Sequence, residues 1–147
     1  MTDKIQIRCA TEQDSAAIAQ LSGDLGYATN PEIMQQRVRE VLASTMDLLL
    51  VAVDSSGQAV GWLQAHAAHI VESGFRVEIT GLIVSPSLRR SGVGRALIKE
   101  AERWAKNRSA QVIVVRSNIK RVESHAFYPA LGYTATKTQQ VYRKPLA

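Results

Sequence analysis

The stretch from Val84 to Leu97 constrains the fold most, because it joins the end of a strand to the start of a helix through a basic turn. It reads Val-Ser-Pro-Ser-Leu-Arg-Arg-Ser-Gly-Val-Gly-Arg-Ala-Leu. Gly92 and Gly94 leave room for a ligand beside backbone N–H groups, and the helix adds the positive end of its dipole. The turn therefore predicts a bound phosphate, with arginines supplying countercharge at its edge.

Size and composition favour one soluble domain over residues 1–147. The chain is 46% hydrophobic and 21% charged, which excludes disordered and fibrous classes. Its longest apolar run, Leu48 to Val53, is far shorter than the roughly 20 residues that span a bilayer, so no membrane partner is expected. The single cysteine, Cys9, cannot form an internal disulfide and is expected to be a small buried residue. No apolar signal-like segment opens the sequence, so we expect a cytoplasmic protein.

Hydrophobic periodicity predicts the element order β-α-α-β-β-β-α-β-α-β, that is, an α/β or α+β domain with helices packed on one sheet. Gly81 is out of place in a regular strand and indicates a bulge or a close backbone approach, with a tolerated small residue as the alternative. The predicted strands cover residues 4–8, 47–54, 58–69, 75–84, 111–115 and, as one or two closing strands, 133–143. The predicted helices cover residues 11–21, 30–44, 92–107 and 121–127, the last limited by Pro129.

Charge is distributed unevenly along the chain. Residues 89–121 hold ten Lys/Arg against two Glu, whereas residues 1–50 hold four Lys/Arg against seven Asp/Glu. A basic middle suits a phosphorylated ligand, and an acidic first third suits a cationic second substrate. A nucleic-acid-binding domain is the weakest reading of this charge, because no nucleic-acid motif accompanies it, and no nucleic-acid partner is expected.

Two well-known phosphate motifs do not fit the turn. The chain has no Walker spacing, and Leu97 stands where a Rossmann fingerprint needs a third small residue. Instead, Arg89-Arg90-Ser91-Gly92-Val93-Gly94 resembles the pyrophosphate signature of the GNAT N-acetyltransferase superfamily. Residues 7–11 with Asp14 are similar to the opening strand and cap of that superfamily, and residues 126–133 (Ala-Phe-Tyr-Pro-Ala-Leu-Gly-Tyr) are similar to its closing motif.

The resemblance implies an α/β/α sandwich in the α+β class, with a mixed, mostly antiparallel sheet, and acetyl-CoA as co-substrate. Two strands would splay apart, and the pantetheine arm would lie in the gap like an added strand. The implied cofactor-binding residues are Leu82, Ile83, Val84, Arg89, Arg90, Ser91, Gly92, Val93, Gly94, Arg95 and Asn118. No metal is expected, because the spacing of His66 and His69 points them to opposite faces of a strand and no spacing of the histidines with Cys or carboxylates completes a metal ligand set.

Acyl transfer to an amine requires a base, because deprotonating an alkyl ammonium at pH 7 costs roughly 4–5 kcal/mol. Glu78 matches the position of the glutamate base in histone-modifying members, and an exposed strand carboxylate or an ion-pair partner is its alternative reading, with water as the alternative base. Tyr128 resembles the tyrosine that protonates the leaving thiolate, and a core tyrosine is its alternative. Asp24 and Tyr27 fall where the family places part of its acceptor site.

The sequence therefore predicts an enzyme that moves an acetyl group to an amine of a small molecule or peptide by direct attack in a ternary complex. A non-catalytic acyl-CoA-binding regulatory module is the alternative. The identity of the amine stays open. A homodimer is compatible with the resemblance, since dimers are frequent in this superfamily.

Overall fold

The computed structural model describes residues 4–26, 29–117 and 120–147. It divides into two compact units, Met1–Val115 and Arg116–Ala147. The first unit holds the sheet and three helices, and the second holds one helix and the C-terminal segment. The described residues contain no helix long and apolar enough to cross a membrane.

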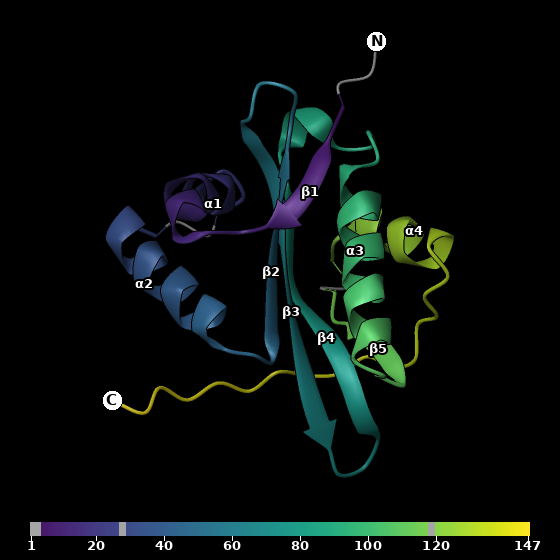
Figure 1. Cartoon of the computed structure of the whole chain (residues 1–147). Coiled ribbons are helices and arrows are strands. Elements are labelled where there is room, and N and C mark those ends of the chain that lie inside the picture. The colour runs from purple at the N-terminus through teal and green to yellow at the C-terminus, as the bar shows by residue number, and fades with distance from the viewer. Residues whose placement is uncertain (1–3, 27–28, 118–119) are drawn as a thin grey trace. The chain divides into compact units, whose positions relative to one another are not determined.

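The first unit is built on a five-stranded sheet in the order β1-β2-β3-β4-β5. The first four strands are antiparallel, and β5 joins β4 in parallel. Helices α1 and α2 lie on one face and α3 lies on the other (Figure 1). The strands are β1 (Gln6–Cys9), β2 (Asp47–Val53), β3 (Ala59–Ile70), β4 (Gly74–Val84) and β5 (Val112–Val115), and the helices are α1 (Ser15–Gly23), α2 (Pro31–Ala43) and α3 (Val93–Asn107). This mixed, mostly antiparallel sheet confirms the predicted α+β class.

The opening of the chain is fixed by a bidentate ion pair. The two terminal guanidinium nitrogens of Arg8 each lie 2.9 Å from a carboxylate oxygen of Asp14. The same carboxylate accepts the Thr11 N–H at 2.7 Å, so a short 3₁₀ turn, Glu12–Asp14, leads into α1. The ion pair therefore explains why the opening motif combines Arg8, in residues 7–11, with Asp14.

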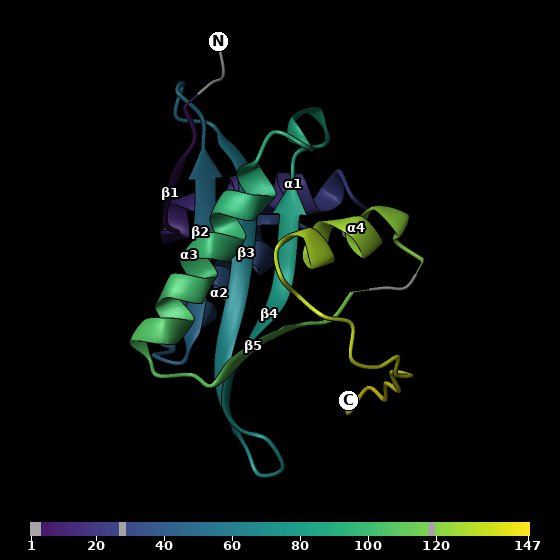
Figure 2. The same ribbon diagram turned by 90° about the vertical axis from the view of Figure 1, so that its right-hand side faces the viewer.

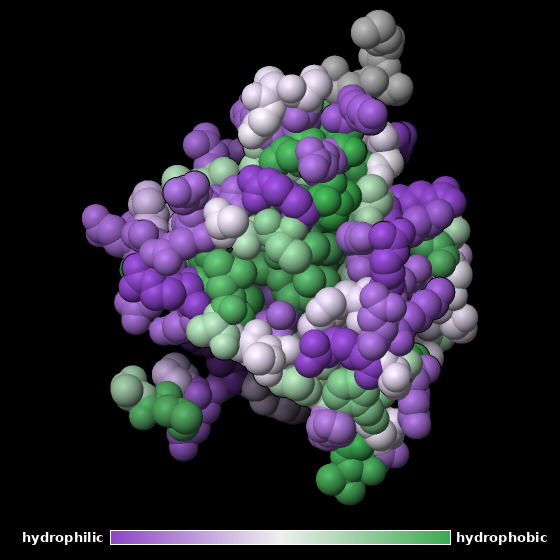
Figure 3. All heavy atoms as spheres, in the orientation of Figure 1, coloured by the Kyte–Doolittle hydropathy of each residue, from purple (hydrophilic) through white to green (hydrophobic). Residues whose placement is uncertain are grey.

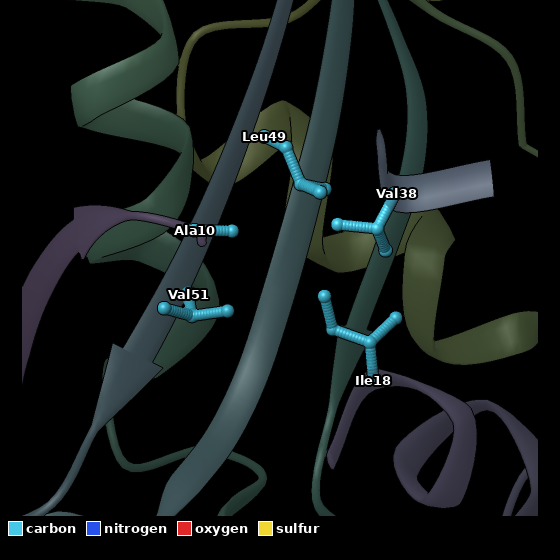
Figure 4. Close-up of a cluster of buried hydrophobic side chains, with 5 residues drawn as sticks. All are labelled: Ala10, Ile18, Val38, Leu49 and Val51. Atoms are coloured by element: carbon cyan, nitrogen blue, oxygen red, sulfur yellow. The ribbon is translucent and has the colours of Figure 1, made fainter. Parts of the chain in front are cut away.

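The α1/α2 face of the sheet carries a compact hydrophobic cluster. Figure 4 shows its five buried side chains converging from β2, from α1 and α2, and from the segment after β1: Ala10, Ile18, Val38, Leu49 and Val51. Helix α2 begins as predicted, because Asn30 accepts the Ile33 N–H at 2.7 Å and Pro31 occupies the first turn. Because Leu49 and Val51 belong to this cluster, the odd-numbered face of β2 at these two residues points toward α1 and α2.

The opposite face is covered by α3, which packs across β2, β3 and β4 (Figure 2). Its fully buried residues follow helical spacing: Val93, Leu97, Ile98 and Ala101. Gly61 of β3 lies beneath this helix, since a Cβ there would be 3.3 Å from Val93 and 3.4 Å from Leu97. In the space-filling view, hydrophobic side chains gather along the β1–β2 edge between hydrophilic helix surfaces (Figure 3). The first unit thus has a packed layer on each side of its sheet.

The second unit begins with α4 (Val122–Ala130), which ends in a glycine cap. The Tyr133 N–H donates to the Tyr128 carbonyl at 3.1 Å, and the Gly132 N–H donates to the Pro129 carbonyl at 3.0 Å. Gly132 has a φ of 93°, the left-handed conformation that this cap requires. The closing motif is therefore a helix end with its cap.

Three expectations about local structure are wrong. Helix α4 runs through Pro129 to Ala130, because a proline in the last turn removes only one helix bond. Residues 133–143 form no strand, since polar side chains occupy both alternating faces of the run and leave no apolar face to bury. Cys9 is exposed, because it is the last residue of an edge strand.

Candidate active site

The predicted phosphate turn is preorganised by its backbone. A short 3₁₀ turn, Pro86–Leu88, follows β4, and Arg90 and Gly92 then adopt φ values of 65° and 92°. Gly92 is the residue immediately before α3, and its carbonyl accepts the Ala96 N–H at 3.0 Å. The N–H groups of the first turn, from Val93 to Arg95, are therefore not used by the helix itself. They are free of intrahelical bonds, which is the backbone arrangement that an anion site requires.

The side chains of the turn have different environments. Arg89, Arg90 and Arg95 are exposed. The Val93 side chain, in the first turn of α3, is buried, and the Ser91 hydroxyl donates to the Leu88 carbonyl. Recognition of an anion here would come from backbone N–H groups, with charge from the arginines.

The strand before the turn has an open edge. Parallel pairing between β4 and β5 ends at Ile79 and Val115, although β4 continues to Val84. The pairing with β3 shifts register between Gln64 and Ala65, which leaves Thr80 as an extra residue. Thus Leu82, Ile83 and Val84 pair with β3 on one side only among the described strands, and the predicted splay and bulge are confirmed.

Gly81 beside this bulge has a packing requirement as well. A Cβ on Gly81 would be 2.7 Å from the ring of Trp62, well inside normal contact distance. Trp62 packs against the α1/α2 cluster, and its buried indole N–H has no hydrogen-bond partner among the described residues. The tryptophan therefore forms the wall of the sheet face next to the bulge.

A row of polar side chains crosses the same sheet face below the bulge. Asp47 of β2 is directly opposite His66 of β3, and His66 is directly opposite Glu78 of β4. Because side chains alternate along a strand, His66 is on the same face as Trp62, which is the α1/α2 face. The Asp47 Oδ1 lies 3.0 Å from His66 Nδ1, and Arg76 lies 3.7 Å from Glu78.

Sequence reasoning identified Glu78 but missed Asp47 and His66. Asp47 and Glu78 are partly buried, with 15% and 23% of their side chains exposed, whereas 46% of His66 is exposed. The available signal was strand alternation, which separates His66 from His69 and puts His66 on one face with the two acids once the register is known. His69 instead packs against Phe75, with ring centroids 4.5 Å apart.

Two of the predicted site residues, Tyr27 and Asn118, lie outside the described residues. Asp24 is exposed at the end of α1, where its N–H donates to the Gln20 carbonyl at 3.0 Å. The described residues contain no group of three or more His, Cys, Asp or Glu that could hold a metal ion.

Tyr128 lies in the second unit within a small aromatic group. Its ring is 5.0 Å from that of Phe127 and 5.9 Å from that of Tyr133, both in edge-on contact. Burial raises the pKa of the Tyr128 phenol, against a smaller opposing effect of the Arg121 charge. The phenol therefore carries its proton at neutral pH and is chemically suited to donate it.

Comparison with known proteins identifies the family of this chain. The model of the Acetyltransferase (GNAT) family matches residues 16–133. The chain is 28% identical over 144 residues to an aminoglycoside N(6′)-acetyltransferase type 1 of Stenotrophomonas maltophilia, covering 95% of this chain and 93% of that one. It is 27% identical over 132 residues to an aminoalkylphosphonate N-acetyltransferase of Salmonella typhimurium, covering 87% and 84%.

The fold has a close counterpart among solved structures. Aminoglycoside N-acetyltransferase AAC(6′)-Iy, solved in complex with CoA, superposes with a TM-score of 0.87. The two sequences are 23% identical, and the match covers 98% of this chain and 97% of that one. This likeness shows that the two proteins share one fold.

Proposed function

Because the chain belongs to the GNAT acetyltransferase family and is an acetyl-CoA-dependent N-acetyltransferase, we propose that its acceptor is a small polycationic amine of the aminoglycoside class, acetylated at the 6′-amino group. The support from similarity is the match to aminoglycoside N(6′)-acetyltransferases over nearly the whole chain. The support from geometry is the polar row, which brings two carboxylates to one sheet face.

The charge of this row separates the two acceptor classes that the relatives suggest. Asp47 and Glu78 contribute two negative charges to this row, and Arg76, 3.7 Å from Glu78, contributes one positive charge. A polyammonium acceptor is attracted to such a surface, whereas an aminoalkylphosphonate brings a negative group that two carboxylates repel. The aminoglycoside class therefore fits the acceptor side better.

For the donor, we propose that acetyl-CoA binds along the open edge of β4 and the turn before α3. The first-turn N–H groups and the arginines of the turn would hold the pyrophosphate. The backbone of Leu82, Ile83 and Val84 would bind the pantetheine arm as an added strand, and a backbone N–H near Leu82 or Ile83 would stabilise the oxyanion. Asn118 stays a predicted contact of the arm.

We propose direct transfer with Glu78 as the base and Tyr128 as the acid. Glu78 accepts a proton from the acceptor ammonium, and the neutral amine attacks the thioester carbonyl. The departing thiolate takes the phenolic proton of Tyr128, and the second N–H proton that the nitrogen loses on becoming an amide returns the phenolate to the phenol. Cys9 is exposed on β1, at the other edge of the sheet from the β4–β5 pair, which argues against an acyl-cysteine intermediate. Asp24 and Tyr27 stay predicted contacts of the acceptor.

A matched pair of acceptors tests the proposed acceptor. Thiol release from acetyl-CoA is measured with an aminoglycoside that has a 6′-amino group and with its 6′-hydroxy counterpart, alongside an aminoalkylphosphonate. We expect rapid release with the amine alone, and mass spectrometry of the product showing one added acetyl group. Equal rates with both aminoglycosides, or a preference for the phosphonate, would contradict the proposal.

Two further expectations concern the protein as a whole. We propose a cytoplasmic location, supported by a single cysteine that excludes an internal disulfide. The homodimer stays a prediction, and sedimentation equilibrium measures it.

A further inference from the structure

The imidazole of His66 is held in a defined orientation beside the proposed base. We propose that His66, oriented by Asp47, is a positioning residue for Glu78 and passes to water the proton that Glu78 takes from the acceptor. This inference rests on the proposed function in taking Glu78 as the base and in naming the acceptor; the orientation of His66 is independent of it.

Asp47 determines which nitrogen of His66 carries hydrogen. A carboxylate only accepts hydrogen bonds, so at 3.0 Å from Asp47 Oδ1 the Nδ1 atom must be the donor. In the neutral ring this leaves Nε2 unprotonated, with a lone pair that can accept a proton. Asp47 is largely buried, with 15% of its side chain exposed, and it comes from the neighbouring strand β2, so the ring has a rigid support.

The register places this basic nitrogen on the ring next to Glu78. His66 and Glu78 are directly opposed on β3 and β4, where facing Cβ atoms lie about 4.5–5.5 Å apart. On the β5 side, the residue opposite Glu78 is Val114, which has no polar group. Of the two residues directly opposite Glu78, His66 is therefore the one that can exchange a proton.

The difference in solvent exposure between Glu78 and His66 indicates the direction of the proposed proton transfer. Glu78 has 23% of its side chain exposed and His66 has 46%, so the proton would move from the more sheltered group to the more open one. An ordinary imidazole binds a proton roughly a hundredfold more tightly than an ordinary glutamate carboxylate.

One proton per turnover passes through this relay to water. The acceptor ammonium gives a proton to the Glu78 carboxylate and becomes the neutral nucleophile. The Glu78 hydroxyl then gives this proton to Nε2 of His66, and the imidazolium keeps its Nδ1–H bond to Asp47. Finally, Nε2–H gives the proton to water, which restores both groups for the next turnover.

Kinetics of a rescued variant distinguish this role from a structural one. In His66→Ala we expect kcat to fall roughly tenfold to a hundredfold, at the lower end of general acid–base effects, with the acceptor KM changed less than about threefold. Added imidazole should restore part of the lost kcat. His69→Ala is the matched control, because it removes an imidazole from the same strand but from the opposite face. It should lose little activity and gain nothing from imidazole.

A wild-type kcat in His66→Ala, or a loss that imidazole does not restore, would overturn the proposal. His66→Gln gives a second test if the alanine variant does not fold, because its amide retains hydrogen bonding but cannot take up a proton at neutral pH. It should show the same fall in kcat, and a wild-type kcat in His66→Gln would equally count against the relay.

A spectroscopic test needs no acceptor, and its outcome is therefore separate from that of the proposed function. Ring ¹⁵N chemical shifts of the wild-type protein should show neutral His66 with hydrogen on Nδ1, and Asp47→Ala should abolish this preference while His69 stays unchanged. Hydrogen on Nε2 in the wild type would overturn the proposal even if the enzyme acetylates aminoglycosides. Absence of aminoglycoside acetylation with the expected shifts would overturn the acceptor assignment alone.

Discussion

The turn before α3 and the polar row across β2, β3 and β4 present ligands with two different kinds of group. The turn offers mainly backbone N–H groups, positioned by a glycine with a φ of 92° and by a helix N-terminus. The row offers side chains that come from three strands and meet only through the sheet register. The proposed donor site is thus encoded locally, whereas the proposed acceptor site depends on the tertiary fold.

The largest expected effect comes from the polar row. Glu78→Gln should lower kcat by roughly a hundredfold to ten-thousandfold, because the amide cannot take the ammonium proton, while the KM for acetyl-CoA stays near wild type. Initial rates of thiol release with each substrate varied measure both constants. Glu72→Gln, in the β3–β4 turn, is the matched control. A rise in the acetyl-CoA KM without a fall in kcat would place Glu78 on the donor side instead.

Tyr128→Phe tests the proposed protonation of the departing thiolate. It should lower kcat roughly tenfold to a hundredfold with little change in either KM, because only proton donation to the thiolate is lost. Since burial raises the pKa of Tyr128, wild-type kcat should fall only as pH rises above the ordinary tyrosine value of about 10. The pH profile of kcat tests this, and a basic limb retained in the phenylalanine variant would contradict the role of acid.

Gly92→Asp should affect the donor region alone. A carboxylate at the entrance of α3 would repel the pyrophosphate and raise the KM for acetyl-CoA roughly tenfold or more, with the acceptor KM unchanged. Gly57→Asp is the matched control, because Gly57 also has positive φ, 85°, and also has open space around its Cβ position. Backbone strain is then comparable in both variants. Equal donor KM values in the two variants would refute the anion site.

Gly81→Ala tests the bulge that lies between the two regions. The added Cβ would meet Trp62 at 2.7 Å, so we expect a loss of about 1–3 kcal/mol in unfolding free energy. Urea denaturation of this variant, of Trp62→Leu and of the double variant measures the coupling. The alanine should cost much less in the Trp62→Leu background, and additive losses would show that the close approach has no energetic consequence.

The smallest effect should come from the opening ion pair, which belongs to neither region. Asp14→Asn should lower the unfolding free energy by about 1 kcal/mol at pH 7 and leave both KM values unchanged. Arg8 lowers the pKa of Asp14 through their hydrogen bonds. The stabilisation is therefore present above the ordinary Asp value of about 3.9 and is lost as pH falls through the lowered value. Thermal unfolding at pH 7 and pH 3 should show the difference between wild type and variant shrink.

The contrast between the turn and the polar row also explains which parts of the fold and of the candidate site the sequence predicts. The turn, the capped helices and the bulge at Gly81 follow from short-range chemistry, and the structure confirms them. The pairing of Asp47 with His66 requires residues 19 positions apart to share one register, and no local pattern specifies that. The closing strand failed as a prediction because β-branched threonines favour extended backbone, yet a strand also needs an apolar face and a partner.

Calorimetric titration of acetyl-CoA tests the central claim most directly, because equilibrium binding involves no chemistry at the acceptor. If backbone groups of the turn bind the donor and side chains of the row handle the acceptor, Gly92→Asp should bind acetyl-CoA at least tenfold more weakly than wild type. Glu78→Gln and Gly57→Asp should both bind it as wild type does. Wild-type affinity in Gly92→Asp, or a tenfold loss in Glu78→Gln, would contradict the division between the two regions.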